Sequence, residues 1–375
     1  MYIRNCISGI STAQCLMVTR NPFPGCVCAL LLLFVSCHEQ PQQVQMEWAL
    51  GTVCIVNLNE GGSSELYARI FARIREIDRT MTVHVSEFQD LLGDTGLADT
   101  LVSGVVAINR QAGIAPVRVR ADLIEVLERA VYYAGLSSGA FDPTIGPLVQ
   151  LWNIGTDTQR IPDDDEIAAA LELVDWRDLI IDREEGTVFL RREGMALDLG
   201  AIAKGYAADE AARIAREGGA VNSVIDLGGN IMALGRREQQ TGEPRLWRIG
   251  IQHPLGDRGS FIGVVPASDT SVVTSGVYER FFESEGRRYH HLLSAASGFP
   301  ADNGLLSVTV VYPHSMDADA LATALFILGF ERGRELIDSI PGAEAIFIFD
   351  DLTLTITGGL DGIFTLISDE FTFRL

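Results

Sequence analysis

Apolar residues recur at helical or alternating spacing along most of the chain after residue 48. In one stretch five of them follow each other at intervals of three or four positions: Leu66, Ile70, Ile74, Ile77 and Met81. This spacing predicts an amphipathic helix, because positions three and four apart lie on one helical face. Ser63 or Ser64, just before the run, can cap the start of that helix.

Other segments predict further helices. Residues 121–138 have the same periodicity, residues 200–217 are rich in alanine, and a third helical pattern covers about 317–330. The acidic run at 163–166 opens another helix, since acidic side chains suit the positive end of the helix dipole. We interpret this run as a cap rather than as a metal site.

Strands are expected mainly in the second half of the chain. A hairpin is predicted at 179–192 around Glu185-Gly186, and short strands follow with the sequences NSVIDL, LWRIGI, FIGVV and SVVTS and again near 345–357. Helices and antiparallel strands alternate without a regular βαβ period, which predicts an α+β fold rather than a doubly wound sheet. No repeat or Pro, Gly or Ser-rich linker interrupts residues 48–375, so we expect them to form a single domain.

Composition and charge narrow the class of protein. The 375 residues are 47% apolar and 21% charged, which is the composition of a folded protein and not of a disordered segment. With 29 basic and 50 acidic residues the net charge is −21. A surface of this charge repels a polyphosphate backbone, which argues against nucleic acid as a partner.

The basic residues are 28 arginines and one lysine, Lys204. A single lysine can remain by chance. The alternative is that position 204 requires a compact ammonium group that a planar guanidinium cannot replace.

The cysteines lie almost entirely in the first tenth of the chain, and only Cys54 falls in the expected folded body. No internal disulfide is therefore expected there. The apolar run at 26–36 would be about 16 Å long as a helix, too short for a hydrocarbon core of roughly 30 Å. It predicts the apolar region of a signal peptide covering 1–36, with Met17 as a second candidate start.

The sequence Phe34-Val35-Ser36-Cys37 resembles a relaxed bacterial lipobox, in which the cysteine is lipidated and becomes the new first residue. We therefore predict lipidation at Cys37, a polar tether over 37–47 and a periplasm-facing protein anchored by lipid to a membrane of the cell envelope. Removal of 1–36, which carries two arginines and no acidic residue, changes the net charge from −21 to −23.

Three short motifs contain residues that chemistry often needs. Phe141-Asp142-Pro143-Thr144-Ile145-Gly146-Pro147 can be an ordinary Asx turn or a ligand-binding loop. The segment 198–205 places an acid and Lys204 around a helix start, where free backbone N–H groups cap the helix or bind a phosphate. In Asp226-Leu227-Gly228-Gly229-Asn230 the paired glycines allow either a tight turn or a close approach of the backbone to a ligand.

A fourth motif runs from Thr274 to Leu293 and predicts a hairpin that turns at Glu285-Gly286. In this register Arg280 lies opposite His291. Neighbouring strand residues point to opposite faces, so His291, and not His290, shares a face with Tyr278. A lone histidine on a strand is either structural or catalytic.

The fifth motif is Asp317-Ala318-Asp319-Ala320-Leu321-Ala322-Thr323-Ala324. Asp319 and Thr323 are four residues apart and therefore neighbours on one helical face. Their oxygens suit Mg²⁺, which takes hard ligands and usually retains waters or substrate phosphate. The other interpretation is a helix cap with a threonine bonded to the preceding turn.

The order of these motifs resembles the ApbE family of FAD:protein FMN transferases, from about Leu50-Gly51-Thr52 to the end of the chain. The resemblance implies an α+β flavin transferase fold with FAD as substrate. The magnesium ligands of the family fall on the carbonyl of Ala201, the side chain of Asp319 and the hydroxyl of Thr323.

The resemblance also implies flavin-contacting residues and a base. The flavin contacts fall on Thr144, Lys204, Asp226, Gly228, Ser275 and Tyr278, and the proposed base falls on His291. Two positions depart from the family pattern. Ser294 stands where an aspartate is usual, and His84 stands where a flavin-holding tyrosine is common.

Three activities are compatible with these residues. The first is magnesium-dependent transfer of FMN from FAD to a serine or threonine of a flavoprotein subunit of a membrane redox complex, with release of AMP. The second is magnesium-dependent hydrolysis of FAD to FMN and AMP, because water can replace the hydroxyl in the same site. The third is a lipoprotein that binds and delivers FAD without chemistry.

Overall fold

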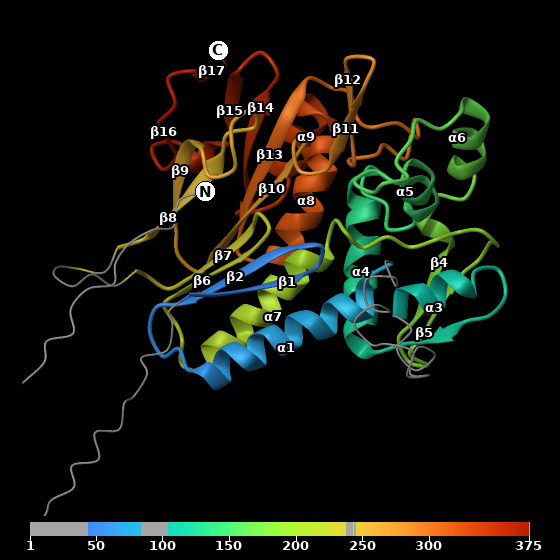
Figure 1. Ribbon diagram of the computed structural model, residues 1–375, viewed down its shortest axis with the longest axis horizontal. Coiled ribbons are helices and arrows are strands. Elements are labelled where there is room, and N and C mark those ends of the chain that lie inside the picture. The colour runs from blue at the N-terminus through green and yellow to red at the C-terminus, as the bar shows by residue number, and fades with distance from the viewer. Residues whose placement is uncertain (1–43, 84–103, 238–242, 244, 375) are drawn as a thin grey trace, which may run out of the picture. The chain divides into compact units, whose positions relative to one another are not determined.

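The fold is built on a large antiparallel-rich sheet with helices on one face (Figure 1). The computed structural model describes residues 44–83, 104–237, 243 and 245–374. Within them nine strands form one sheet in the order β1-β2-β6-β7-β10-β13-β14-β15-β17, and only β15 and β17 pair in parallel. The strands are β1 (Val44–Ala49), β2 (Thr52–Leu58), β6 (Ser223–Leu227), β7 (Asn230–Leu234), β10 (Thr270–Gly276), β13 (Leu305–Tyr312), β14 (Glu344–Phe349), β15 (Thr353–Ile356) and β17 (Thr372–Phe373).

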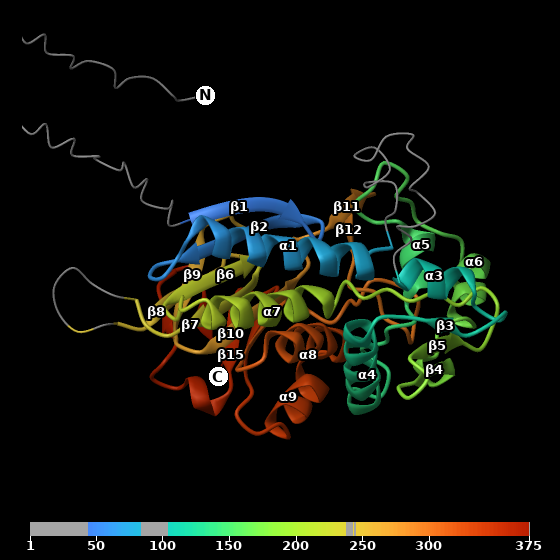
Figure 2. The same cartoon turned by 90° about the horizontal axis from the view of Figure 1, so that it is seen from below.

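Helices α1, α7 and α8 cover one face of this sheet, and Figure 2 shows them in succession along it. The helices of the described residues are α1 (Ser64–Met81), α3 (Gly104–Arg110), α4 (Ala121–Leu136), α5 (Gly146–Trp152), α6 (Asp164–Leu171), α7 (Ala203–Glu217), α8 (Ser315–Leu328) and α9 (Phe330–Asp338), with short 3₁₀ helices at Trp176–Asp178 and Gly358–Leu360.

The alternation of side chains along β14 separates two apolar cores. Ala345 and Phe347 pack with the helices in the larger core. Ile346 and Ile348 point to the opposite face, because successive residues of a strand alternate in direction. There they join a smaller core under a second sheet, whose strands are β8 (Trp247–Gln252), β9 (Phe261–Ala267) and β16 (Thr365–Leu366).

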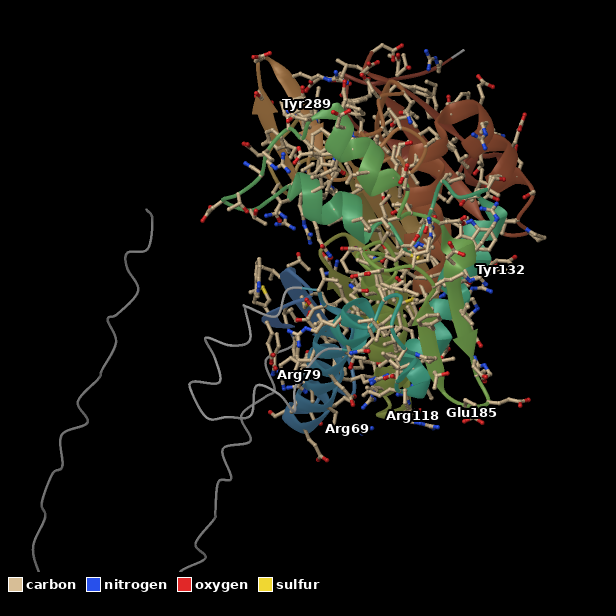
Figure 3. All side chains as sticks on the ribbon, turned by 90° about the vertical axis from the view of Figure 1, so that its right-hand side faces the viewer. Arg69, Arg79, Arg118, Tyr132, Glu185 and Tyr289 are labelled. Carbon is tan, nitrogen blue, oxygen red and sulfur yellow. The ribbon has the colours of Figure 1, made fainter. Side chains whose placement is uncertain are left out.

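Smaller elements lie beside the main sheet. A third sheet has the order β3-β5-β4 and consists of β3 (Val117–Arg118), β4 (Leu179–Asp182) and β5 (Thr187–Leu190). Its exposed end carries the ion pair between Arg118 and Glu185, 3.5 Å apart (Figure 3). A hairpin of β11 (Phe281–Ser284) and β12 (Arg287–His290) packs through Tyr289 against Trp152 of α5, with ring centroids 5.7 Å apart.

The structure confirms the α+β class and most expected elements, with some different bounds. The Ser63 hydroxyl accepts the N–H of Leu66 at the start of α1, and Glu166 accepts the N–H of Asp163 at the start of α6. Two helices differ from the prediction. Helix α8 ends at Leu328, because the next residue, Gly329, has a φ of +77° that breaks the helical geometry, and α9 follows as a separate helix. Helix α5, in the expected loop, begins at Gly146 with a proline in its first turn.

Two expectations concern the membrane and the cysteines. In the described part of the chain, no helix is both long and apolar enough to cross a bilayer. Among the described residues Cys54 is the one cysteine, and it is buried and forms no disulfide. Its thiol donates a hydrogen bond to the carbonyl of Ala49 over 3.4 Å. The segment predicted as signal peptide, Cys37 and most of the predicted tether lie outside the described residues. Positions 44–47, predicted as the end of the tether, instead belong to β1 of the main sheet.

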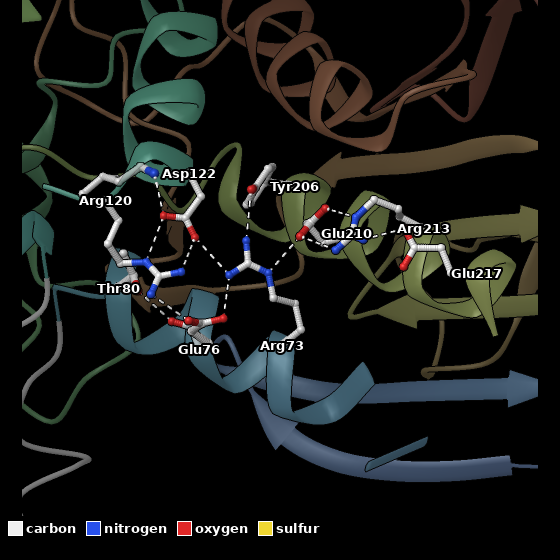
Figure 4. A network of polar contacts seen from close by, with 10 residues as sticks. Arg73, Glu76, Thr80, Arg120, Asp122, Tyr206, Glu210, Arg213 and Glu217 are labelled. Carbon is white, nitrogen blue, oxygen red and sulfur yellow. Dashed lines mark hydrogen bonds and ion pairs between the residues drawn. The ribbon is translucent and has the colours of Figure 1, made fainter. Parts of the chain in front are cut away.

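Arg73 joins three helices through a network of polar contacts (Figure 4). Its guanidinium nitrogens lie 2.7 Å from Glu76 of α1, 2.9 Å from Asp122 of α4 and 2.9 Å from Glu210 of α7. It also donates to the hydroxyl of Tyr206 over 3.1 Å. Only 14% of the Arg73 side chain is exposed. Each of its carboxylate partners also contacts a second arginine, but Arg73 is the cation that all three share.

Arg73→Met should lower the free energy of unfolding by about 2–3 kcal/mol, because partly buried carboxylates lose their shared cation. Urea denaturation measures this change. Arg213→Met is the matched control: Arg213 also contacts Glu210, but half of its side chain is exposed, and we expect a loss of about 1 kcal/mol or less. Equal losses in the two variants would contradict this account of the network.

Candidate active site

A cavity of about 390 Å³ opens between the main sheet, the start of α7 and the β11–β12 hairpin. Segments far apart in the sequence line it, including the β1–β2 turn, the loop before α5 and one side of α8. Seven of the residues singled out in the sequence meet here: Ala201, Lys204, Gly228, Ser275, His291, Asp319 and Thr323.

Asp319 places a buried carboxylate in the lining of the cavity, and 3% of its surface is exposed. Its Oδ2 accepts the backbone N–H of Gly205 over 3.0 Å, and its Oδ1 lies 3.5 Å from Nζ of Lys204. Lys204 also donates to the carbonyl of Gly200 over 2.8 Å. One turn later on α8, Thr323 Oγ1 lies 3.3 Å from Ser275 Oγ on β10. Carboxylate, ammonium and hydroxyl groups therefore converge in one place.

The position of α8 is fixed from α7. Both carboxylate oxygens of Asp209 accept backbone N–H groups at the start of α8, from Ser315 and Met316, each over 2.9 Å. Burial raises the pKa of Asp209 to about 6. The carboxylate satisfies two N–H groups that a helix start leaves without partners, and it holds Asp319 beside Lys204.

Gly205 allows α7 and α8 to come close together. A Cβ at this position would lie 2.6 Å from Cα of Met316 and closer still to the carbonyl of Ser315. Both are backbone atoms, so they cannot move aside as a flexible side chain could. The glycine is therefore required where Lys204 and Asp319 meet.

Gly205→Ala should lower the free energy of unfolding by about 1–3 kcal/mol, because the added methyl group overpacks the contact between α7 and α8. The same overpacking shifts α8 relative to Lys204, so the initial rate of the reaction in the cavity should fall at least tenfold. Thermal melting and initial rates measure the two effects. Gly358→Ala serves as control, since open space surrounds its Cβ position. An active, stable Gly205→Ala variant would show that the two helices tolerate separation.

The β11–β12 hairpin has the predicted register, and it presents His291 to the cavity. Glu283 lies opposite Arg288, and the backbone N–H of His291 donates to the carbonyl of Arg280 over 3.1 Å. The ring Nδ1 of His291 lies 3.2 Å from that same carbonyl oxygen. A carbonyl only accepts, so Nδ1 carries the proton and Nε2 retains the lone pair. Burial, and then the charge of Arg280, lower the pKa of His291 to about 3, so the ring is neutral near pH 7.

His290 points to the opposite face of the hairpin, as the alternation predicts. Its Nε2 donates to the carbonyl of Ala301 over 3.1 Å, and its Nδ1 accepts the N–H of Leu292 over 3.3 Å. The ring packs edge to face on Phe326, with centroids 5.6 Å apart. His290 is thus held by structural contacts, whereas His291 lines the cavity.

Three predicted flavin contacts do not line the cavity. Thr144 is fully buried and donates to Asp142 Oδ1 over 2.7 Å in an Asx turn, and it is Asp142 that lines the cavity. Asp226 accepts the N–H of Gly229 over 2.9 Å behind Gly228. Tyr278 is half-buried, and burial raises the pKa of its phenol.

Gly228 fits both interpretations of the paired glycines, because it makes a tight turn and also lines the cavity. Its φ is +65°, which turns the chain, and a Cβ there would collide with the side chain of Thr52. Ser294, the departure from the family pattern, lies in a turn where its N–H donates to the carbonyl of Phe299 over 2.8 Å. His84 lies outside the described residues.

Two cavity-lining arginines, Arg280 and Arg258, were not among the predicted site residues. Arg280 reaches the turn between β1 and β2, where its Nη2 would lie 3.1 Å from a Cβ on Gly51, and its Cδ would lie 3.6 Å from a Cβ on Gly155. Arg258, in the loop between β8 and β9, lines the cavity near Asp226. For Arg280 the predicted pairing with His291 was a usable signal. For Arg258 the sequence offered none.

The donor set suits a hard cation. Asp319 offers a buried carboxylate and Thr323 a buried hydroxyl, and Ala201 lines the same cavity. Among the described residues, no group of three or more His, Cys, Asp or Glu side chains could hold a metal. An ion held by Asp319, Thr323 and the carbonyl of Ala201 would have one carboxylate, one hydroxyl and one carbonyl as ligands, which is a Mg²⁺ pattern rather than a Zn²⁺ pattern.

Curated proteins are similar to this chain over most of its length. A curated relative, the FAD:protein FMN transferase of Treponema pallidum (strain Nichols), is 40% identical over 323 residues, which cover 84% of this chain and 86% of the relative. Another, from Klebsiella pneumoniae (strain 342), is 38% identical over 283 residues, covering 76% and 82%.

Solved structures extend the likeness to the fold. The ApbE protein of Thermotoga maritima has a TM-score of 0.72 at 28% identity and covers 85% of this chain and 98% of its own. The flavin transferase ApbE from Vibrio cholerae has a TM-score of 0.71 at 26% identity, with the same coverage. The model of the ApbE family matches residues 50–347, and the chain therefore belongs to the ApbE family.

Proposed function

We propose that this protein is an FAD:protein FMN transferase, which moves FMN from FAD to a serine or threonine hydroxyl of a flavoprotein and releases AMP. The observation that carries the proposal is the meeting of Lys204, His291, Asp319 and Thr323 in one cavity. Family membership and relatives named for this activity support it.

The reaction replaces the phosphoanhydride bond of FAD by a phosphoester bond to the acceptor. The acceptor hydroxyl oxygen bonds to the phosphorus of the FMN half of FAD, and the bond from that phosphorus to the bridging oxygen breaks. AMP leaves with the electron pair of the broken bond. The hydroxyl proton goes to Nε2 of His291, whose lone pair is free because Nδ1 bonds to the carbonyl of Arg280.

Positive charge is the second requirement, because a pyrophosphate enters a protein of net charge −21. Lys204, Arg258 and Arg280 line the cavity and provide cations for the phosphates. Asp319, Thr323 and the carbonyl of Ala201 would hold Mg²⁺. When bound, the ion would supply charge that stabilises the phosphates during transfer.

Chromatography of adenine nucleotides tests the proposal. The protein incubated with FAD and a flavoprotein subunit of a membrane redox complex should release AMP with Mg²⁺, and EDTA should abolish the release. AMP together with free FMN, equally with and without the subunit, would indicate a pyrophosphatase instead. Intact FAD retained in the presence of Mg²⁺ would indicate a delivery protein.

We also propose that Cys37 carries lipid and anchors the protein to a membrane of the cell envelope, facing the periplasm. The lipobox-like sequence around Cys37 supports this. Anchoring would bring the cavity near membrane redox complexes, the expected source of acceptor subunits.

Cys37→Ser should leave the full chain unlipidated and in the soluble fraction. Fractionation and mass spectrometry of the N-terminal peptide measure both properties. Wild-type protein processed in the same cells is the control. A Cys37→Ser protein that stays in the membrane fraction would show that residues 26–36 anchor the chain themselves.

A further inference from the structure

The outward face of the β1–β2 hairpin is apolar and exposed. Side chains along β1 alternate between two faces. On one face Glu47 pairs with Arg75 of α1 and Ala49 is buried. The alternate residues of β1 point to the other face, away from the helix. We call these outward residues, with their neighbour on β2, the hairpin face: Val44, Met46, Trp48 and Val53, which are 39%, 64%, 67% and 38% exposed. Trp48 lies directly opposite Val53 in the register.

This face continues into the active-site cavity. Trp48 lines the cavity together with Gly51 and Thr52 of the adjoining turn. Among the large apolar side chains exposed in the described residues, Trp48 is the one that also lines the cavity. Other exposed residues that line the cavity include the charged side chains of Arg258 and Glu279. An apolar patch against a functional cavity marks an interaction surface.

The proposed reaction requires a polypeptide at this rim. The acceptor hydroxyl belongs to a folded protein, and it must enter the cavity where the phosphates bind. The flanking residues of the acceptor must then lie across the rim. β1 is the first strand in the sheet order, and an extended segment can bind along such an edge through backbone hydrogen bonds and alternate side chains.

Resting on the proposed function, we propose that the hairpin face docks the acceptor flavoprotein through an extended, apolar segment next to the modified serine or threonine. An uncharged surface suits this role in a protein of net charge −21, which repels acidic partners elsewhere. The chain's own residues 38–43 (HEQPQQ) are polar and offer no apolar side chains to cover the face. Trp48 is the anchor, since tryptophan is enriched among residues that dominate binding energy.

The test uses residues of the face that do not line the cavity. In the double variant Val44→Ser, Met46→Ser, the KM for the acceptor subunit that the wild type labels should rise about fivefold or more. AMP release without acceptor and the dissociation constant of FAD should stay unchanged. Ile114→Ser is the control, because Ile114 is 69% exposed in the loop between α3 and β3 and does not line the cavity.

Several results would overturn the docking proposal. An unchanged KM in the double variant would do so, as would an equal rise in the control or a parallel loss of AMP release. Conversion of a dimer to a monomer with unchanged KM, seen by sedimentation, would assign the face to self-association. A wild type that labels no subunit at all is a separate outcome, since it removes the proposed function itself.

A cross-linking experiment locates the contact on the acceptor. A photoreactive benzoylphenylalanine at position 46, and in a second protein at position 114, is irradiated with the same purified acceptor subunit. The account predicts an adduct from position 46 alone, within a few residues of the flavinylated side chain. Adducts remote from that side chain, or equal yields at both positions, would contradict it.

Discussion

Asp319→Asn should reduce transfer of FMN by about 10³-fold and abolish measurable binding of Mg²⁺, because the predicted metal site has one carboxylate and loses its charge. The fold should survive, since the asparagine oxygen can still accept the N–H of Gly205 that now donates to Asp319. Initial rates, calorimetric titration with Mg²⁺ and circular dichroism measure the three properties.

Asp317→Asn is the matched control on the same helix. Asp317 is also an aspartate and lies two residues earlier, but Arg129 donates to both of its oxygens and it does not line the cavity. This variant should lose stability and retain magnesium-dependent transfer. If Asp319→Asn keeps magnesium-dependent activity, or if both variants lose it equally, the metal is bound elsewhere.

His291→Gln should lower transfer by about 10²–10⁴-fold, which is the usual contribution of a positioned base. Binding of FAD should change little, because the neutral ring contributes no charge to the phosphates. His290→Gln is the neighbouring control and should lower stability while retaining activity, since His290 contacts Ala301 and Phe326 on the other face. If His290→Gln loses activity and His291→Gln keeps it, the register of the hairpin does not identify the base.

The pH dependence follows from the depressed pKa of His291. An imidazole in the unfolded chain has a pKa of about 6.5, and in the folded protein it is about 3. As pH falls below 6.5, the unfolded chain binds the proton before the folded protein does. The free energy of unfolding is therefore unaffected by His291 above pH 6.5 and decreases on acidification.

Between about pH 5 and 8 the imidazole of His291 in the folded protein stays neutral. The ratio of wild-type to His291→Gln kcat/KM should therefore be constant there, and a ratio that falls below pH 6.5 would contradict the shift.

Local patterns predicted much of this site because short-range geometry fixes them. The i, i+4 spacing placed Asp319 and Thr323 on one face of α8, and strand alternation separated His291 from His290. The turn at Glu285 and Gly286, both with positive φ, set the register of the β11–β12 hairpin that carries the two histidines.

Contacts between remote segments could not be predicted in this way. Arg280 enters the cavity because Gly51 and Gly155, far away in the sequence, leave room for its side chain. The resemblance led us to expect Thr144 at the flavin, yet Asp142 turns back onto it and takes the place at the cavity wall. The order of the nine strands in the described sheet likewise depends on pairings across most of the chain.

Intact-mass spectrometry of the acceptor subunit tests the central claim most directly. The protein, FAD, Mg²⁺ and the subunit are incubated together, and AMP is quantified in the same sample. The account predicts a subunit heavier by FMN less one water, fluorescent in a denaturing gel, with one AMP released for each label. AMP release accompanied by free FMN and an unmodified subunit would contradict it.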